Sequence, residues 1–453
     1  MASPPGRPAF HLSHPGPGWA WPGDPNGIFF WKGRYHLHYI YDRGGAAGID
    51  PLRRFLDGAG DYAFAHVSSP DLVHWTSHRT TLTPDVLGHG AFSGGGFVTK
   101  EGRPAIVYQG QGSGANHVVI AEDDDLERWT RPAPAVVHVR PGQDGSVIAH
   151  ADPHAWLEND TYYAIFGGTT TGKPATLLRS ADLADWEYLG VLLDPDLPDT
   201  GEDTDVSCPD FFPIGDQHML LCISHNKGCR YYLGEWRDER FVPEVHGRMN
   251  WHATDVFAPE SVLTPDGRRV MWAWAFIEAP WSGIQILPRE LDLPGDGILR
   301  IRPLRELERL RADERSVRGI AVDDGSRLVS DVGGAALELA VTFGPGAARR
   351  FGVAVHCDAR GGGGLRIEVD LDAGTVSAGA AAAPFDPGDE EVTLRVFVDT
   401  YLVDVFANDR QAIFLPHFAD AADVHVAVFA DGGDRVADLT AWRMTSMDEV
   451  TAP

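Results

Sequence analysis

The chain has 453 residues, more than one hydrophobic core normally serves, so two domains are expected. Hydrophobic residues make up 43% of it and charged residues 23%, which is typical of a globular protein and excludes a disordered or fibrous one. The formal net charge of -27 argues against a nucleic acid or an anionic membrane as partner, because basic surfaces bind both. A small neutral or cationic ligand is favoured, and the sequence leaves the oligomeric state open.

The N-terminal residues and the cysteines bear on where the protein works. Residues 1–21 are rich in Pro, Gly and His and hold no apolar run of signal-peptide length, and no later segment has the ~18 apolar residues of a membrane span. We therefore expect a cytoplasmic protein. Cys208, Cys222, Cys229 and Cys357 lack zinc-like spacing and are expected to be buried thiols. The 19 histidines are scattered, so neither a metal site nor a cofactor is predicted.

A repeat gives the strongest indication of the fold. The pattern Asp-Leu-x-x-Trp occurs at residues 71–75, 125–129 and 182–186, and Trp236 follows after a similar interval without the Asp-Leu pair. Short strand-like runs separated by Gly, Pro and Asp fill the intervals, about four to each repeat. Such units predict a five-bladed β-propeller over residues 1–300. The alternative, one large irregular sandwich, does not explain the tryptophan period.

A short amphipathic segment follows the propeller. Leu304, Leu307 and Leu310 recur at intervals of three within a run of charged residues. This spacing predicts a helix with one apolar face. Residues 301–314 are therefore assigned to a linker helix.

Beyond the linker the period of the apolar residues changes to two. Residues 365–371 and 392–399 alternate apolar and polar side chains, as half-buried strands of a sandwich do. The Ala- and Gly-rich residues 378–383 are predicted to form a loop. We therefore expect a β-sandwich over residues 315–453, and the fold class is all-β, a five-bladed β-propeller followed by a C-terminal β-sandwich.

Three acidic residues precede predicted strands of different blades. Asp24 lies in WPGDPNG, Asp152 in HADPH, and Asp205 shortly before SCPDFF. Asp beside Pro, Asn or Gly ordinarily serves turn formation, which remains the alternative for each. The innermost strands of all blades converge on one funnel, so these carboxylates are expected to be neighbours in space. Hydrolysis of a glycosidic bond needs such a group of carboxyls.

Five blocks stand in order along the chain: residues 21–27 (WPGDPNG), 68–75 (SSPDLVHW), 92–94 (FSG), 281–290 (WSGIQILPRE) and 398–408 (VDTYLVDVFAN). Together they resemble glycoside hydrolase family 32, whose members cleave β-fructofuranosidic bonds in sucrose, inulin and levan. The resemblance covers nearly the whole chain, and five ordered blocks are far more specific than any one of them. It implies the same propeller and sandwich that the repeat and the alternation predict.

The resemblance also assigns roles to single residues. Asp24 takes the place of the family's nucleophile, and Asp152 that of the carboxylate that stabilises the transition state. Aromatic side chains of these blocks would form apolar walls for a sugar ring, although each is equally compatible with a blade core. The residues expected to bind substrate are Trp21, Asn26, Phe92, Ser93, His154, Cys208 and Trp281.

The chain departs from the family at two places. The family's Arg-Asp-Pro is Ala151-Asp152-Pro153 here, so the arginine that holds sugar hydroxyls is absent. The family's Glu-Cys-Pro-Asp, whose Glu is the general acid/base, begins with Ser207, which cannot protonate a leaving alkoxide near neutral pH. General acid catalysis is worth about 10²–10⁴-fold in rate, so an enzyme without a replacement would be feeble.

Three explanations of the missing acid remain open. Asp205 lies two residues before Ser207, and on an extended strand the two side chains share a face, so Asp205 would supply the proton. Alternatively, the substrate has a leaving group that needs no proton. In the third explanation the protein binds a sugar without cleaving it.

We predict a retaining-type glycoside hydrolase that acts on β-fructofuranosides with an altered acid/base position. Its catalytic group would consist of Asp24, Asp152, Asp205 and Ser207. The alternatives are a non-catalytic protein that binds fructans or furanosides on a degenerate glycosidase scaffold, and a fructosyl transferase that excludes water from the acceptor site. In each case the partner is a small carbohydrate.

Overall fold

The computed structural model divides the chain into two compact units, which we describe separately. The propeller unit comprises Ser13–Arg248 and Val256–Pro288. The sandwich unit comprises Met249–Asp255 and Arg289–Asp448, together with the N-terminal residues up to Leu12. The structure describes residues 6–15, 18–45, 51–130, 133–134, 136–138, 148–168, 173–193 and 205–447.

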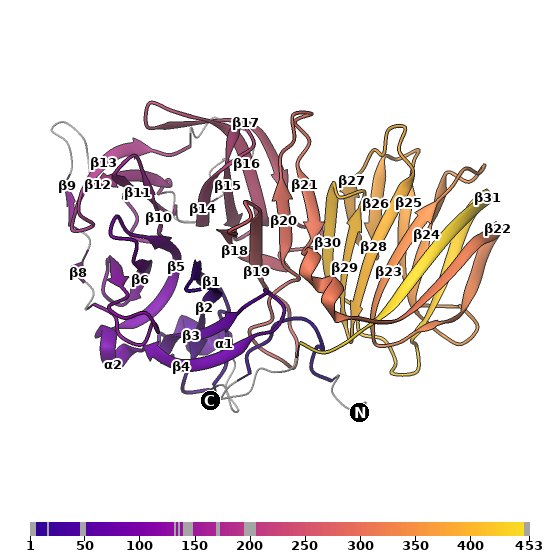
Figure 1. Cartoon of the computed structure of the whole chain (residues 1–453), viewed down its shortest axis with the longest axis horizontal. Helices are drawn as coiled ribbons and strands as arrows, with labels where there is room; N and C mark the ends of the chain where they lie inside the picture. Colours follow the sequence, from indigo (N-terminus) through magenta and orange to yellow (C-terminus); the bar gives the residue numbers. More distant parts are fainter. Residues whose placement is uncertain are drawn as a thin grey trace. The chain divides into compact units, whose positions relative to one another are not determined.

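Five antiparallel sheets follow one another along the described part of the chain, as the repeat predicts. In each sheet four strands are joined in chain order, and the first strand lies nearest the middle of the propeller unit (Figure 1). A short strand, β9, extends the third sheet by pairing in parallel with β13. The predicted five-bladed β-propeller is confirmed.

The strands of the five blades have the following bounds. The first blade holds β1 (Pro25–Trp31), β2 (Arg34–Asp42), β3 (Tyr62–Ser69) and β4 (Thr76–Leu82). The second holds β5 (Gly90–Val98), β6 (Pro104–Gln111), β7 (Asn116–Ile120) and β8 (Ala133–Pro134). The third holds β9 (Val136–His138), β10 (His154–Glu158), β11 (Thr161–Phe166), β12 (Thr176–Ser180) and β13 (Asp185–Val191). The fourth holds β14 (Ser207–Ile214), β15 (Gln217–Ser224), β16 (Gly228–Arg237) and β17 (Arg240–Arg248). The fifth holds β18 (Val256–Leu263), β19 (Arg269–Ala275), β20 (Arg289–Asp292) and β21 (Arg300–Pro303), although the contacts group β20 and β21 with the sandwich unit.

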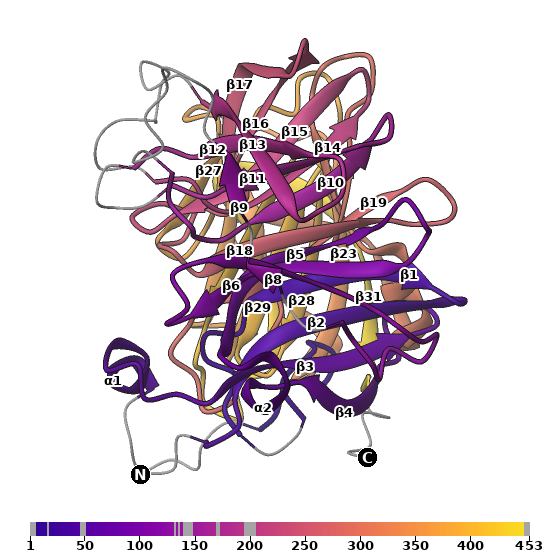
Figure 2. The ribbon, with the colours of Figure 1, turned by 90° about the vertical axis from the view of Figure 1, so that its left-hand side faces the viewer.

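Two short helices interrupt the propeller. The first, α1 (Pro51–Leu56), connects β2 to β3, and α2 (Pro84–Leu87) connects β4 to β5. Figure 2 shows both on the same side of the unit as β3 and β4. Neither these helices nor any other helix in the described residues has the length and apolar character needed to cross a membrane.

The Asp-Leu-x-x-Trp repeat forms the turn between the third and fourth strands of the first three blades. In the first of these turns Asp71 Oδ1 accepts hydrogen bonds from two backbone N–H groups at 3.3 and 3.0 Å, and Asp182 does so at 3.0 Å twice in the third blade. Each leucine is held at a left-handed φ, which disfavours residues with a side chain. The φ angles are 69°, 59° and 66° at Leu72, Leu126 and Leu183, and the buried tryptophans are Trp75, Trp129 and Trp186. The tryptophan period of the sequence therefore reflects one kind of turn that recurs in three blades.

Glycines let the innermost strands approach one another closely. In β5 a Cβ atom at Gly96 would lie 2.9 Å from the backbone nitrogen of Ile28 and 3.0 Å from the Cα atom of Gly27, both in β1. A side chain there would push the two strands apart, because both contacts are with backbone. The glycine-rich sequence after Ser93 therefore packs the inner strands around the propeller axis.

The sandwich unit consists of two sheets that share one long strand. The first half of β31 (His425–Met444) pairs with β24 (Arg350–Cys357), and its second half pairs with β23 (Ala336–Phe343). From β24 the first sheet continues through β25, β26 and β27, and from β23 the second continues through β28, β29 and β30, while β22 (Arg311–Gly333) pairs along both halves of β31. The remaining strands are β25 (Leu365–Asp370), β26 (Thr375–Ala378), β27 (Ala381–Pro384), β28 (Val392–Asp399), β29 (Leu402–Ala407) and β30 (Gln411–Pro416).

The apolar residues of the alternating segments fill the space between these sheets, so the predicted sandwich is confirmed. The prediction of a loop over residues 378–383 is wrong. These residues end β26 and begin β27, and Ala378, Ala381 and Ala383 are fully buried in the core. Alanine is depleted in strands, but burial of its small side chain against the facing sheet outweighs that weak preference.

The predicted linker helix differs from the structure in type and length. Arg305–Leu310 forms a 3₁₀-helix, η2, and β22 begins directly after it. Leu304, Leu307 and Leu310 are buried on one face, because a spacing of three matches the three residues per turn of a 3₁₀-helix. By its contacts η2 belongs to the sandwich unit, whose longest segment begins at Arg289. The domain ranges 1–300, 301–314 and 315–453 stay a prediction.

Candidate active site

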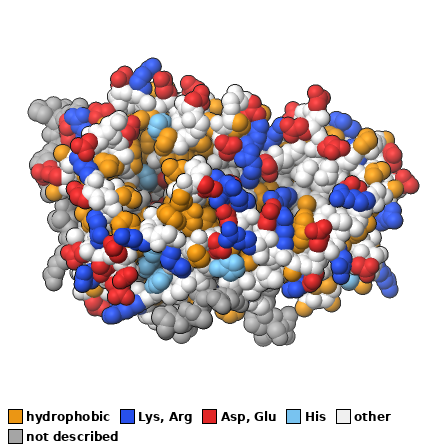
Figure 3. All heavy atoms as spheres, in the orientation of Figure 1, with side chains coloured by type: hydrophobic (Ala, Val, Ile, Leu, Met, Phe, Trp, Pro, Cys, Tyr) orange, Lys and Arg blue, Asp and Glu red, His pale blue; other side chains and the backbone are white. Residues whose placement is uncertain are grey.

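A cavity of about 320 Å³ opens in the propeller unit where the innermost strands begin. All five blades contribute to it, as expected for a funnel on the propeller axis. Figure 3 shows hydrophobic side chains gathered near the middle of the face that this unit turns to the viewer, with charged side chains around them. The residues that line the cavity are Trp21, Pro22, Asp24, Phe55, Phe92, Ser93, Gln109, Asp152, Cys208, Ile223, His225, Phe257, Trp274 and Phe276.

Irregular backbone turns several of these side chains into the cavity. The pairing register of β5 shifts between Ala91 and Gly94, and that of β14 shifts between Ser207 and Asp210. A bulge of this kind re-aims a side chain that a regular strand would place on the other face. Asp152 and Cys208 also have left-handed φ angles of 38° and 45°. Such strained residues persist where the surroundings hold them, and they cluster at functional sites.

Asp24 is held by its neighbours through one carboxylate oxygen. The hydroxyl of Ser93 donates to Asp24 Oδ2 at 2.6 Å, whereas Oδ1 has no hydrogen-bond partner in the described part of the chain. Asn26 anchors the same loop, because its amide donates to the carbonyl of Asp24 and accepts a hydrogen bond from the N–H of Gly94 at 2.7 Å. Oδ1 is therefore a buried oxygen whose hydrogen-bonding capacity is unused within the described residues.

Asp152 enters the cavity from the loop before β10. Its Oδ2 accepts a hydrogen bond from the backbone N–H of Cys208 at 3.4 Å, and its own N–H donates to the side chain of Gln109 at 3.5 Å. These contacts tie the loop to β14 and β6. The structure thus brings Asp24 and Asp152, predicted from sequence as partners, to one cavity.

Burial raises the pKa values of both carboxyl groups. The pKa of Asp24 rises to about 7, because burial and the neighbouring Asp152 outweigh the hydrogen bond from Ser93 and the attraction of His225. Burial also raises the pKa of Asp152, against the opposing effect of His225. Two carboxyls that share an apolar cavity keep their protons more readily than exposed ones. Perturbed values of this kind are characteristic of functional sites.

Ser207 and Asp205 lie behind the cavity wall rather than in it. The hydroxyl of Ser207 donates to Asp205 Oδ2 at 2.7 Å, and both residues are buried, so they do share a face. Burial by itself raises the pKa of Asp205, but hydrogen bonds from His225 and Ser207 outweigh it and hold this pKa below its ordinary value. The carboxylate of Asp205 is thus held by hydrogen bonds from its neighbours.

The other predicted contacts divide into two groups. Trp21, Phe92, Ser93 and Cys208 line the cavity, and burial raises the pKa of the Cys208 thiol, which stays protonated. Asn26, His154 and Trp281 do not line it.

His154 and Trp281 have other surroundings. His154 is buried, with its Nε2 atom 3.7 Å from Asp210 Oδ1, and burial lowers its pKa. The side chain of Trp281 is 38% exposed. Direct sugar contact by either residue stays a prediction.

Several lining residues are absent from the prediction. Trp274 continues the aromatic wall, with its ring centroid 5.7 Å from that of Trp21 and 4.9 Å from that of Phe276. His225 could have been found from the β14–β15 hairpin, which pairs Ser207 with Ile223 and therefore places residue 225 opposite Asp205. The other missed residues are Pro22, Phe55, Gln109, Ile223, Phe257 and Phe276. Among the residues that the structure describes, no cluster of His, Cys, Asp or Glu could hold a metal ion.

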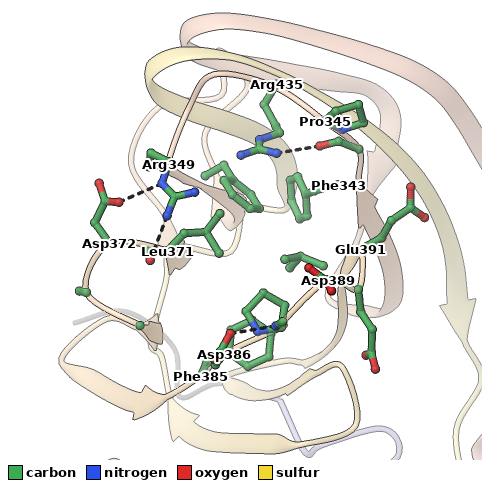
Figure 4. Close-up of a pocket in the computed structure, with 18 of the residues that line it drawn as sticks. Phe343, Pro345, Arg349, Leu371, Asp372, Phe385, Asp386, Asp389, Glu391 and Arg435 are labelled. Atoms are coloured by element: carbon green, nitrogen blue, oxygen red, sulfur yellow. Dashed lines mark hydrogen bonds and ion pairs between the residues drawn. The ribbon is translucent and has the colours of Figure 1, made fainter.

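A larger hollow of about 800 Å³ lies in the sandwich unit, but its charged groups already have partners or face solvent (Figure 4). Arg349 donates to Asp372 at 2.9 Å, and Arg435 donates to the carbonyl of Gly344 at 2.8 Å. The acidic residues Asp389 and Glu391 on its rim are exposed. Unlike the propeller cavity with Asp24 Oδ1, this hollow has no buried carboxylate oxygen without a hydrogen-bond partner among its described lining residues.

The propeller, the sandwich and the buried carboxylate pair define the class of protein as a glycoside hydrolase. Residues 14–303 match the model of the Glycosyl hydrolases family 32 N-terminal domain, and residues 306–443 match that of the Glycosyl hydrolases family 32 C terminal. The chain belongs to glycosyl hydrolases family 32. The resemblance found in the sequence is thereby confirmed.

Relatives and solved structures agree with this assignment. The chain is 27% identical to a sucrose-6-phosphate hydrolase of Zymomonas mobilis, over 89% of this chain and 84% of the relative. It is also 27% identical to a raffinose invertase of Escherichia coli, over 97% of this chain and 95% of the relative. The crystal structure of fructan 1-exohydrolase IIa from Cichorium intybus shares the fold, with a TM-score of 0.79 at 20% identity over 97% of each chain.

Proposed function

We propose that the chain hydrolyses unphosphorylated β-fructofuranosides with retention of configuration, and that Asp24 is the nucleophile. The observation that supports this most is the unbonded Asp24 Oδ1 atom in a cavity that also holds Asp152. Retaining glycosidases use one carboxylate to attack the anomeric carbon and form a covalent intermediate, which water then cleaves. The names of the relatives, an invertase and sucrose-6-phosphate hydrolases, support a fructofuranoside as substrate.

The roles of the neighbouring groups follow from their contacts. The Ser93 hydroxyl fixes Oδ2, so the attacking oxygen of Asp24 keeps one orientation. Asp152, held by the N–H of Cys208, would accept hydrogen bonds from hydroxyls of the sugar and stabilise positive charge in the oxocarbenium-like transition state. The aromatic wall would pack against the ring and exclude water, which strengthens both effects.

The charges in the cavity favour a substrate without phosphate. None of the described residues that line it is Lys or Arg, and two of them are carboxylates. Phosphate groups are bound by cationic side chains or backbone N–H groups, so a sugar phosphate gains nothing here and is repelled by Asp24 and Asp152. Sucrose and the ends of fructans are therefore the proposed substrates, and a cytoplasmic location remains part of the proposal.

The test is a panel of sucrose, sucrose 6-phosphate, inulin and levan, with products followed by NMR spectroscopy. We expect hydrolysis of sucrose or a fructan with β-fructofuranose as the first anomer released, and a kcat/KM for sucrose 6-phosphate at least about tenfold lower, since one unfavourable charge contact costs roughly 1.4 kcal/mol or more. Release of the α-anomer first, or no turnover of the whole panel, would refute the proposal. Transfer of fructose to a second sugar in preference to water would identify a transferase instead.

A further inference from the structure

We propose that His225, oriented by Asp205, is the general acid and base that takes the place of the absent glutamate. This inference rests on the proposed function and names the group that protonates the leaving oxygen. His225 lies directly after β15 and lines the cavity that holds Asp24 and Asp152. Its side chain is 56% exposed, so it can meet a ligand.

The contacts of the imidazole give its two nitrogens different tasks. Nδ1 lies 2.6 Å from Asp205 Oδ2, so it carries the proton that this carboxylate accepts. Nε2 has no hydrogen-bond partner in the described residues, as an acid that awaits its substrate requires. A carboxylate on one nitrogen and a reacting group on the other is the arrangement in which imidazole acts as acid and base.

Asp205 cannot take this role itself, because its carboxylate is fully engaged. It accepts hydrogen bonds from the Ser207 hydroxyl at 2.7 Å, from the backbone N–H of His225 at 2.9 Å and from the His225 ring. Its main-chain carbonyl accepts two more, from the Ser224 hydroxyl at 2.6 Å and from Arg230 at 2.9 Å. Asp205 is therefore a positioning residue that acts through His225.

The serine at position 207 fits the same arrangement. Its hydroxyl is one of the donors to Asp205, and its side chain is buried beneath the cavity wall. A glutamate there would place a second carboxylate against Asp205, where like charges repel. The loss of the family's glutamate and the His225–Asp205 pair are thus two parts of one change in the site.

The surrounding charges favour the protonated form of the imidazole. The hydrogen bond to Asp205 raises the pKa of His225, and the charges of Asp205, Asp152 and Asp24 raise it further, against the effect of burial. Phe257, from the neighbouring inner strand β18, faces the ring edge to face at 5.6 Å and brings no charge. The pKa of His225 is therefore shifted in the direction that favours its acid form.

The reaction balances with these groups and water. Asp24 Oδ1 forms a bond to the anomeric carbon while the bond from that carbon to the leaving oxygen breaks, and the leaving oxygen takes the proton from His225 Nε2. The imidazole, now neutral, then accepts a proton from water as the water oxygen attacks the same carbon. The ester bond to Asp24 breaks, and both groups return to their starting forms.

The experiment compares two leaving groups in three variants. His225→Gln keeps the size and polarity of the side chain but cannot transfer a proton, Asp205→Asn removes the charge that orients it, and His74→Gln is the control. His74 has the same kind of contact, with Nδ1 2.9 Å from Asp71 Oδ2, and its side chain is 48% exposed outside the cavity. The substrates are sucrose, which loses an alkoxide, and 4-nitrophenyl β-D-fructofuranoside, whose leaving group scarcely needs a proton.

We expect His225→Gln to lower kcat/KM for sucrose by about 10²–10⁴-fold and that for the aryl substrate by less than about tenfold. Asp205→Asn should shift the alkaline limb of the pH profile to lower pH, since the pKa of His225 would fall, whereas a merely structural role would leave this limb in place. His74→Gln should change neither substrate. Equal losses on both substrates, or no loss on sucrose, in a folded His225→Gln variant would overturn the inference. If the wild type cleaved neither substrate, the proposed function would fail as well, so the two failures are distinguishable.

Discussion

Buried acidic residues occur in both units, but Asp24 and Asp152 of the propeller cavity lack the basic partners that the buried acidic residues of the sandwich unit have among the described residues. In the sandwich unit His11 lies 2.8 Å from Asp399 and 2.9 Å from Asp404, and Arg311 lies 2.7 Å from Glu338. Among the described residues that line the cavity, His225 is the one basic side chain beside Asp24 and Asp152. The buried carboxylates of the sandwich unit are thus balanced by adjacent basic side chains, whereas no Lys or Arg among the described lining residues balances those of the cavity.

The effect of burial on acidity shows the same difference. Burial alone would lower the pKa of His11, but the two carboxylates outweigh it and raise this pKa to about 9. Burial in the cavity raises the pKa of Asp24 to about 7, and none of the lining residues that the structure describes is a Lys or Arg that would lower it again. The first arrangement stabilises the native state and the second destabilises it, which is the usual relation between a structural and a catalytic group.

The largest expected effect is on turnover of the proposed substrates. Asp24→Asn removes the attacking charge while keeping the shape of the side chain, so kcat for sucrose should fall by at least about 10⁴-fold. Steady-state assays with a circular dichroism spectrum of the variant check this. Retained activity in a folded Asp24→Asn protein would show that another residue is the nucleophile.

The same chemical change should have opposite effects on stability in the two units. Asp399→Asn breaks the buried ion pair between His11 and residue 399 and should lower the free energy of unfolding by about 3–5 kcal/mol. Asp24→Asn removes an ionisable group whose pKa is raised in the fold and should increase stability by about 1–3 kcal/mol at pH 8. Urea unfolding of both variants measures the two changes. If both substitutions changed the free energy of unfolding in the same direction, the distinction between paired and unpaired carboxylates would be wrong.

Much of this arrangement follows from local sequence, and the rest depends on register. The tryptophan period gives the propeller because the same turn recurs, and Asp24 and Asp152 follow from their places before inner strands. His225 has no motif of its own and becomes visible only when the β14–β15 hairpin is aligned. Asp205 shares a face with Ser207, as predicted, but neither residue lines the cavity, which depends on how the blades pack and not on a local sequence pattern.

Two groups of buried histidines should make stability depend on pH in opposite ways. In the first blade, burial lowers the pKa of His36 to about 4 and that of His38 to about 3, so the neutral forms stabilise the fold. Their contribution is present above the unfolded value of about 6.5 and is lost as the pH falls from there toward 4 and 3.

The contribution of His11 runs the other way. Its pKa is raised, so its stabilisation is present below about 6.5 and is lost as the pH rises through 9. Thermal unfolding of the wild type, His38→Gln and His11→Gln between pH 4 and 10 measures both effects. The first variant should lose part of the acid-side dependence, since His36 keeps its share, and the second should lose the alkaline one. Unchanged pH dependence in either variant would contradict these assignments.

The smallest expected effects distinguish the two hollows. Trp274→Ala removes part of the wall of the propeller cavity and should raise KM for sucrose about tenfold, as loss of one aromatic contact with a sugar ring costs roughly 1–2 kcal/mol. Asp389→Asn in the sandwich hollow should leave both kcat and KM within about twofold, because exposed charges contribute little. A larger effect of Asp389→Asn on kcat or KM would indicate that the sandwich hollow contributes to substrate binding.

The most direct test is to trap the sugar on the unpaired carboxylate. In His225→Gln, attack on the aryl fructofuranoside should proceed while removal of the intermediate by water is slow, since the base is gone. Rapid acid quenching, proteolysis and mass spectrometry should then show one fructosyl unit attached to Asp24. Turnover of the aryl substrate without any label on Asp24, or a label on another residue, would contradict the account.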